Sequence, residues 1–133
     1  MNKETQLVLQ LYQGQANLTD KIWWYFATVS LGIVGFATAS DATRQSTSGM
    51  LVLTFTYLAF AVGNAISLHR AQNDLHVFTG KIAELVDGDP IFENRFKAFP
   101  VKAASWFHGI LATGVVVTLV YYLWQSLNCL TKA

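Results

Sequence analysis

The sequence has 133 residues, a length typical of one domain, with 53% hydrophobic residues and only 13% charged residues. An average soluble domain carries about 25% charged residues, so the composition disfavours a soluble protein. The net charge of +1 indicates no strong attraction to nucleic acid or to another acidic partner by itself. Cys129 is the only cysteine, which excludes an intrachain disulfide.

Charged residues are absent from three long stretches of the chain. No Asp, Glu, Lys or Arg occurs in the 19 residues 22–40, the 25 residues 45–69 or the 29 residues 103–131. About 20 apolar residues cross the hydrocarbon core of a bilayer. The sequence therefore predicts an all-α membrane protein, a single integral membrane domain over residues 1–133, with transmembrane helices at 22–40, 49–68 and 103–124.

An amphipathic helix is predicted ahead of the first span, at residues 4–19. Its apolar residues share one face, and its glutamines take the other. Asn17, followed by Asp20 three residues later, resembles a capping pair, so we expect the first span to start as a separate helix near this point. The N-terminal helix is expected either to lie at the membrane surface or to pack on neighbouring helices.

Small residues at helix-packing spacing occur in all three predicted spans. Such residues allow the backbones of membrane helices to approach closely. The pairs are Gly35/Ala39, Ala59/Gly63, Ala61/Ala65 and Gly109/Thr113.

The second span is predicted to continue as a cytoplasmic helix to about residue 86, because a heptad-like apolar stripe runs past the membrane. The stripe consists of Leu68, Leu75, Phe78, Ile82 and Leu85. Two interpretations stay open. The stripe packs against other copies of the chain, as in a coiled coil, or it packs on residues 90–99 of the same chain.

Traced back into the span, the same helix face becomes partly polar. Polar groups in a bilayer avoid lipid and face a bundle interior or a water-filled path. The predicted pore-lining residues are Thr54, Tyr57, Asn64 and Ser67. The alternative for Asn64 is a hydrogen bond between copies of the chain that fixes their register. His108, near one end of the third span, is expected to reach toward the membrane surface or to act as a proton sensor.

The helix is predicted to stop at "DGDP", residues 87–90, since glycine and proline end helices. A short cap helix is predicted at residues 90–99, where Phe92, Phe96 and Phe99 share one face. Together with the end of the preceding helix it forms a small cytoplasmic cap, which is too small to fold alone.

Basic and aromatic residues are interleaved around this cap. Cations with aromatics can hold single-stranded nucleic acid through phosphate contacts and base stacking, and they are equally typical of a segment that meets anionic lipid. The candidates for an anionic ligand are Arg70, Lys81, Arg95, Phe96, Lys97 and Lys102.

Signatures of enzymes, metal sites and cofactors are absent from the sequence. His69 and His76 share a helical face, but two histidines are too few ligands for a metal unless symmetry multiplies them. We therefore expect no enzyme activity, no metal and no cofactor.

The positive residues predict the orientation. Seven of the nine flank the N-terminus and the second loop, and two, Arg44 and Lys132, lie in the first loop and at the C-terminus. Since positive residues favour the cytoplasmic side, the N-terminus is predicted inside and the C-terminus outside, in a multi-pass protein of a cell inner membrane.

The order of elements, with "LYQGQANLTDKIWWYF" (11–26) and "YLAFAVGNAISLHRAQ" (57–72), resembles the small pore-forming membrane effectors of bacterial anti-phage systems, of the Hailong effector type. The resemblance implies antiviral defence, a tetramer and a cytoplasmic crown that binds a single-stranded DNA signal. It supplies no binding residue, because none can be matched position by position.

The leading hypothesis is a homo-oligomeric ion channel gated through its cytoplasmic cap, possible ligands being a nucleotide or short single-stranded DNA. One alternative is a non-conducting membrane anchor or assembly subunit for a cytoplasmic partner. Another is a phage holin, which usually starts outside the cell.

Overall fold

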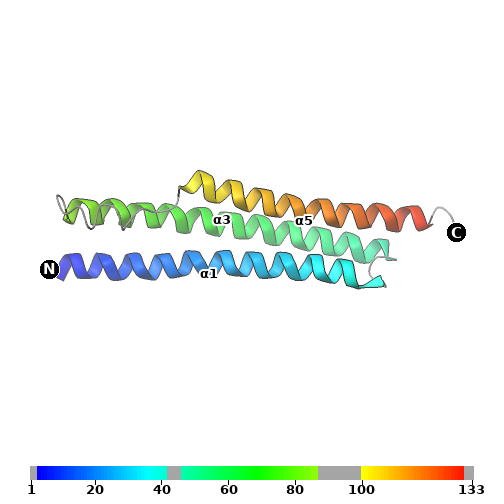
Figure 1. Cartoon of the computed structure of the whole chain (residues 1–133), viewed down its shortest axis with the longest axis horizontal. Helices are drawn as coiled ribbons and strands as arrows, with labels where there is room; N and C mark the ends of the chain where they lie inside the picture. The colour runs from blue at the N-terminus through cyan, green and yellow to red at the C-terminus, as the bar shows by residue number, and fades with distance from the viewer. Residues whose placement is uncertain (1–2, 42–45, 87–99, 131–133) are drawn as a thin grey trace.

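In the computed structural model, which describes residues 3–41, 46–86 and 100–130, the chain is all-helical (Figure 1). The helices are α1 (Lys3–Ala39), α3 (Thr47–Leu85) and α5 (Val101–Leu130). Each is long and apolar enough to cross a membrane, so the expectation of three such helices is confirmed. Consecutive helices run antiparallel, and the two ends of the chain lie at opposite ends of the molecule (Figure 1).

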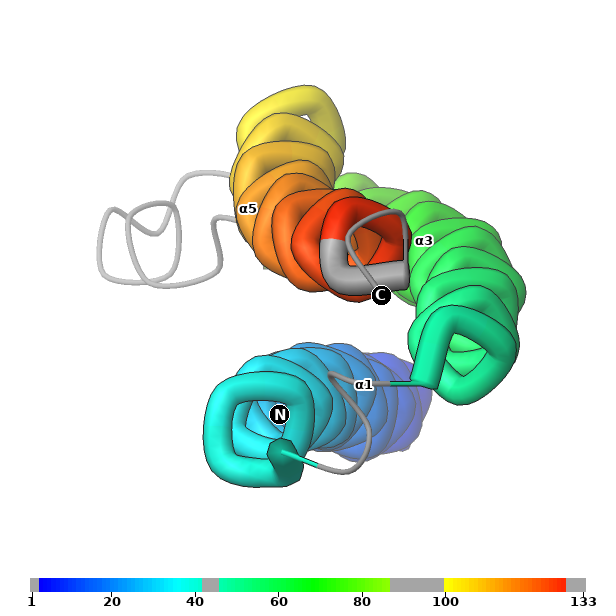
Figure 2. The backbone as a smooth tube through the Cα atoms, turned by 90° about the vertical axis from the view of Figure 1, so that its right-hand side faces the viewer, coloured from blue at the N-terminus to red at the C-terminus, as the bar shows by residue number. Residues whose placement is uncertain are grey.

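The number of helices that lie side by side changes along the length of the molecule. α1 and α3 lie side by side from end to end, whereas α5 begins partway along α3 (Figure 1). We call the part with three helices the bundle: residues 17–39, 47–71 and 101–128. The remaining two-helix part, residues 3–16 and 72–85, is the stalk. In the end-on view of Figure 2, α3 lies beside both other helices, and α1 and α5 contact each other least.

The separate N-terminal helix that the sequence predicts is part of α1. No boundary occurs at Asn17–Asp20, because α1 continues unbroken from Lys3 to Ala39. Asn17 is exposed, and the hydroxyl of Thr19 donates to the carbonyl of Gln15 at 2.9 Å within the helix. The buried side of α1 continues across the expected boundary at helical spacing, which explains why the capping signal is overridden. Its buried residues are Val8, Thr19, Phe26, Ser30 and Ala37.

α3 starts two residues before the predicted position and ends one before it. Ser46 caps it, since its side chain accepts a hydrogen bond from the backbone N–H of Gly49 at 3.1 Å. Gly80 does not interrupt the helix, which ends at Leu85. The cap helix predicted at 90–99 lies outside the described residues.

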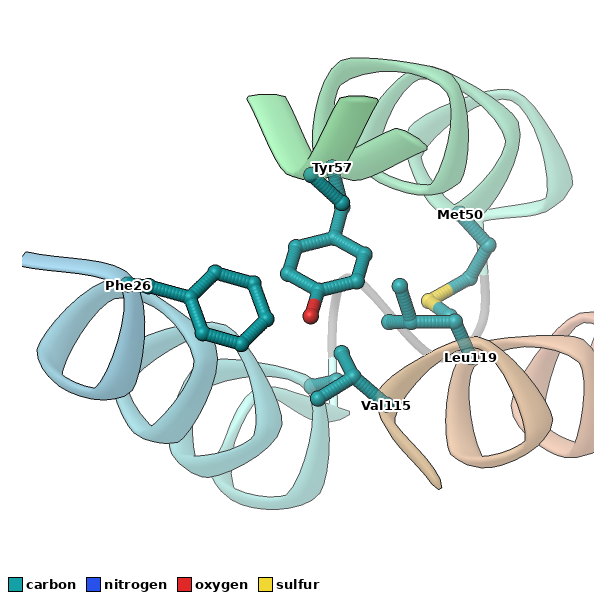
Figure 3. Packing of buried hydrophobic residues seen from close by; sticks show 7 residues of the cluster. Phe26, Met50, Tyr57, Val115 and Leu119 are labelled. Carbon is teal, nitrogen blue, oxygen red and sulfur yellow. The ribbon is translucent and has the colours of Figure 1, made fainter. Parts of the chain in front are cut away.

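The hydrophobic core lies in the bundle and receives side chains from all three helices (Figure 3). Phe26 of α1, Tyr57 and Met50 of α3, and Leu119 of α5 have no exposed surface. Large side chains that interlock in this way fix the rotation of each helix about its own axis. That rotation decides which polar residues face inward and which face outward.

Candidate functional site: the polar interior of the helix bundle

A hydroxyl pair crosses the interface between α1 and α3 in the middle of the bundle. The hydroxyl oxygens of Ser30 and Tyr57 are 3.1 Å apart and buried. A buried hydroxyl without a partner is costly, and here each hydroxyl satisfies the other. The ring of Tyr57 belongs to the core, while its oxygen reaches toward α1 (Figure 3).

A second polar pair joins α3 to α5, nearer the stalk. The amide nitrogen of Asn64 lies 3.3 Å from Nε2 of His108. With the amide nitrogen as donor, Nε2 accepts, so this arrangement uses neutral His108 with its proton on Nδ1. The expected reach of His108 toward the membrane surface is wrong, because its side chain is only 5% exposed.

Aromatic rings of α1 enclose His108. The ring of Phe26 stacks on the imidazole with centroids 3.9 Å apart and planes at 24°. Trp23 approaches edge-on with a centroid distance of 6.3 Å. The imidazole therefore connects all three helices: it bonds to α3 and packs against α1 from its position on α5.

The four predicted pore-lining residues do not share one environment. Thr54 and Tyr57 are buried, Asn64 is half-buried and Ser67 is exposed. Thr54 donates to the carbonyl of Met50 at 2.7 Å, and Ser67 donates to the carbonyl of Gly63 at 3.0 Å. Three of the four therefore face the interior of their own chain, and Ser67 alone among them faces outward.

The side chains of the predicted oligomer stripe are largely buried within the single chain. Leu68, Leu75 and Ile82 are buried, and Phe78 and Leu85 are half-buried. α1 runs alongside α3 over this whole length (Figure 1), and Nε2 of Gln15 donates to the carbonyl of Ala71 at 3.2 Å. α1 is thus one neighbour of this part of α3 within the single chain, and packing against other copies stays a prediction. Packing on residues 90–99, the other interpretation, lies outside the described residues.

The candidates for an anionic ligand are described in part. Arg70 and Lys102 are exposed near the start of α5, and Arg95, Phe96 and Lys97 lie outside the described residues. Nζ of Lys81 lies 2.9 Å from a carboxylate oxygen of Glu84, one turn along α3. The hydrogen bond and charge of Glu84 raise the pKa of Lys81, so its ammonium stays charged but is already paired.

Most of the predicted small-residue pairs face outward. Gly35/Ala39, Ala59/Gly63 and Gly109/Thr113 are exposed, whereas Ala61 is buried and Ala65 half-buried. A Cβ atom added at Gly35, Gly63 or Gly109 would meet nothing within 4 Å. These glycines therefore have no close neighbour within the described part of the chain. The helix faces that carry them are accessible to other molecules.

Reasoning from the sequence missed two buried polar residues: Ser30, the hydrogen-bond partner of Tyr57, and Gln72. Ser30 lies four residues beyond Phe26, on the side of α1 that is buried throughout, and that spacing was the available signal. His69 and His76 are exposed. Among the described residues, no three His, Cys, Asp or Glu side chains gather closely enough to hold a metal ion.

Fold and site together define a class: an all-helical chain whose three described helices suit a membrane, with polar groups paired in its interior. Comparison with known proteins goes no further, since no family model, curated protein or solved structure matches the sequence.

Proposed function

We propose that this chain is a subunit of a homo-oligomeric membrane ion channel that is controlled through its stalk. The observation that supports assembly is the outward direction of the pairs Gly35/Ala39, Ala59/Gly63 and Gly109/Thr113. Lipid tails are as apolar as leucine, so membrane helices associate by close packing at small residues rather than by hydrophobic burial. Open faces of this kind on three helices favour contact with helices of other copies.

The path for ions would run between copies, along the outward polar face of α3. Ser67 and Arg70 follow one another on this face at helical spacing, and both are exposed. Thr54, Tyr57 and Asn64 would line such a path only if α1 or α5 moved away from α3. Ser67 is therefore the first pore-lining candidate in this proposal.

Control by an anionic ligand belongs to the same proposal. Arg70 and Lys102 are exposed close to where the stalk leaves the bundle. The distribution of positive residues favours a cytoplasmic stalk and an external C-terminus, in an inner membrane. The resemblance to Hailong-type effectors adds a nucleotide or short single-stranded DNA as the ligand, a tetramer as the assembly and anti-phage defence as the setting.

The test combines the mass of the solubilised complex with ion flux into liposomes. Wild-type protein is expected to form one defined oligomer and to carry flux. Gly63→Leu is expected to lower the oligomer mass and the flux together, because a leucine fits the single chain but obstructs a close neighbour. Leucine also favours a helix more than glycine does, so the variant does not weaken α3 itself.

Val62→Leu is the matched control. Val62 is the exposed residue immediately before Gly63 on α3. The change adds one methylene and leaves Gly63 in place. It is expected to leave both mass and flux unchanged. A monomeric wild-type protein, or a Gly63→Leu variant with normal mass and flux, would contradict the proposal.

A non-conducting assembly subunit for a cytoplasmic partner is the second candidate, and the interior pairing favours it. Ser30 pairs with Tyr57 and Asn64 with His108, so these four groups need no water-filled path. This candidate expects a defined oligomer without ion flux, and a partner that copurifies through the stalk. A topology reporter on the N-terminus separates both candidates from a holin, for which it would lie outside.

A further inference from the structure

A pocket opens where α5 begins, between all three helices at the junction of bundle and stalk. Its volume is about 410 Å³. Asp20 and Trp23 of α1, Gln72 and Leu75 of α3, and Phe107 and Leu111 of α5 contribute to its lining. Among the three helices that line it, α1 and α5 contact each other least.

Gln72 is the unusual residue of this pocket. Its side chain is 3% exposed, and its carbonyl oxygen Oε1 is buried without a hydrogen-bond partner. A buried acceptor of this kind is unfavourable unless a donor reaches it. Asp20, an exposed carboxylate, adds a second acceptor and a negative charge to the same lining. The polar side of the pocket therefore calls for a positively charged group with several N–H donors.

Apart from Thr19, the rest of the lining is largely apolar. Leu75, Phe107 and Leu111 form part of it, and Phe107 and Leu111 are about half exposed toward the surroundings of the bundle. A ligand that fits must therefore join a cationic donor group to an apolar body. This is the chemistry of a lipid rather than of a soluble metabolite.

The position of the pocket agrees with that chemistry. Charged residues resume on all three helices around it, at Asp20 and Lys21, at Arg70 and at Lys102, so this level corresponds to the headgroup layer of a bilayer. Lys21 and Lys102 are exposed at this level but outside the pocket lining, and they add positive charge that suits the phosphates of a headgroup layer.

We propose that this pocket binds a membrane lipid with a primary ammonium headgroup, of the phosphatidylethanolamine class. Once the Gln72 amide turns toward the pocket that it lines, its Oε1 accepts a hydrogen bond from the ammonium. Asp20 pairs with the charge of the ammonium, and Leu75, Phe107 and Leu111 contact the apolar part. The inference requires that the chain lies in a bilayer. It requires neither oligomerisation nor conduction, because one chain supplies every residue of the pocket.

Phosphatidylcholine with the same acyl chains is the discriminating probe, since its quaternary ammonium has the same charge but no N–H to donate. Lipid binding to the purified full-length chain is measured by native mass spectrometry, which also reports the oligomer mass. Wild-type protein is expected to bind phosphatidylethanolamine about tenfold more tightly than phosphatidylcholine, the effect of satisfying one buried acceptor. Equal binding of the two lipids would overturn the proposal.

Two variants locate the preference. Gln72→Leu removes the unpaired acceptor, so the variant is expected to bind the two lipids about equally. The control Gln13→Leu, at an exposed glutamine of α1, is expected to retain the preference for phosphatidylethanolamine. Asp20→Asn is expected to reduce it several-fold, and Asp74→Asn, at an exposed position outside the pocket, is not. Asp20 is exposed, so its variant keeps the test valid even if Gln72→Leu fails to fold. A preference that survives both changes would overturn the assignment.

A water-soluble competitor separates a lipid from a free amine. Glycerophosphoethanolamine carries the same headgroup without acyl chains, so it is expected to displace no lipid at equal concentration. Displacement would mean that the headgroup alone is bound and would overturn the lipid assignment. A wild-type chain that is monomeric yet shows the preference would contradict the proposed channel and leave this inference intact.

Discussion

In the bundle, α3 packs between two helices, whereas in the stalk α1 is its partner among the described residues. Both parts use one continuous face of α3, which includes Tyr57 and Leu68 in the bundle and Leu75 and Ile82 in the stalk. The bundle contains the charge-free stretches, while Asp74, Lys81 and Glu84 are exposed in the stalk. If the bundle lies in a bilayer and the stalk in water, as proposed, one helix face serves both environments because the same partner helix follows it through both.

The two environments differ in what stabilises a buried leucine or isoleucine. In water, burial removes apolar surface from the solvent and also gains packing contacts. In a bilayer, the alternative to burial is contact with equally apolar lipid, so packing remains as the main gain. The comparison therefore predicts that replacing a buried apolar side chain by alanine lowers the free energy of unfolding more in the stalk than in the bundle.

The largest effect is expected for Ile82→Ala in the stalk. Ile82 is buried, and the loss of its side chain should reduce the local stability of the stalk by about 3 kcal/mol. Hydrogen exchange of the backbone amides of α1 and α3 in the stalk measures this opening. Val77→Ala, at a residue that is 70% exposed, is the control and should change exchange little.

A smaller effect is expected for Leu119→Ala in the bundle. Leu119 has no exposed surface, but its loss removes packing without exposing apolar groups to water, so we expect about 1.5 kcal/mol. Reversible unfolding in mixed detergent micelles gives the value. A cost equal to or above that of Ile82→Ala would break the comparison.

Asn64→Leu is expected to destabilise the bundle by about 1 kcal/mol, because it leaves His108 buried without its hydrogen-bond partner. His108→Leu in the same chain should recover part of this loss, since neither polar group then remains. The same unfolding assay on the two single variants and the double variant measures the coupling. Independent, additive effects would show that the pair contributes nothing.

Lys81→Met should have the smallest effect. The pair with Glu84 is exposed on the stalk, and solvent and salt screen such pairs. We expect no measurable change in hydrogen exchange of the stalk. A clear loss of protection would mean that the charged face of the stalk contributes to its folding.

The sequence predicted the three long apolar helices because about 20 residues without charge are typical of a helix that can cross a membrane. It failed at Asn17–Asp20, where a local capping signal competes with a burial pattern that becomes clear only once α3 lies alongside α1. Asn64 was identified as unusual from its residue type. Its bond to His108, 44 positions away, depends on how α3 and α5 pack, and spacing along one helix carries no such information.

The absence of a break in α1 and α3 also has a mechanical consequence. At the usual rise of 1.5 Å per residue, α1 is a single rod of about 56 Å and α3 one of about 59 Å, and both extend from the tip of the stalk through the bundle. A torque applied at the stalk tip therefore turns Phe26 and Tyr57 in the bundle together with the stalk residues, since neither rod has a joint that could absorb it. From the start of α5 onward, such a rotation would have to change the packing of α1 and α3 against α5.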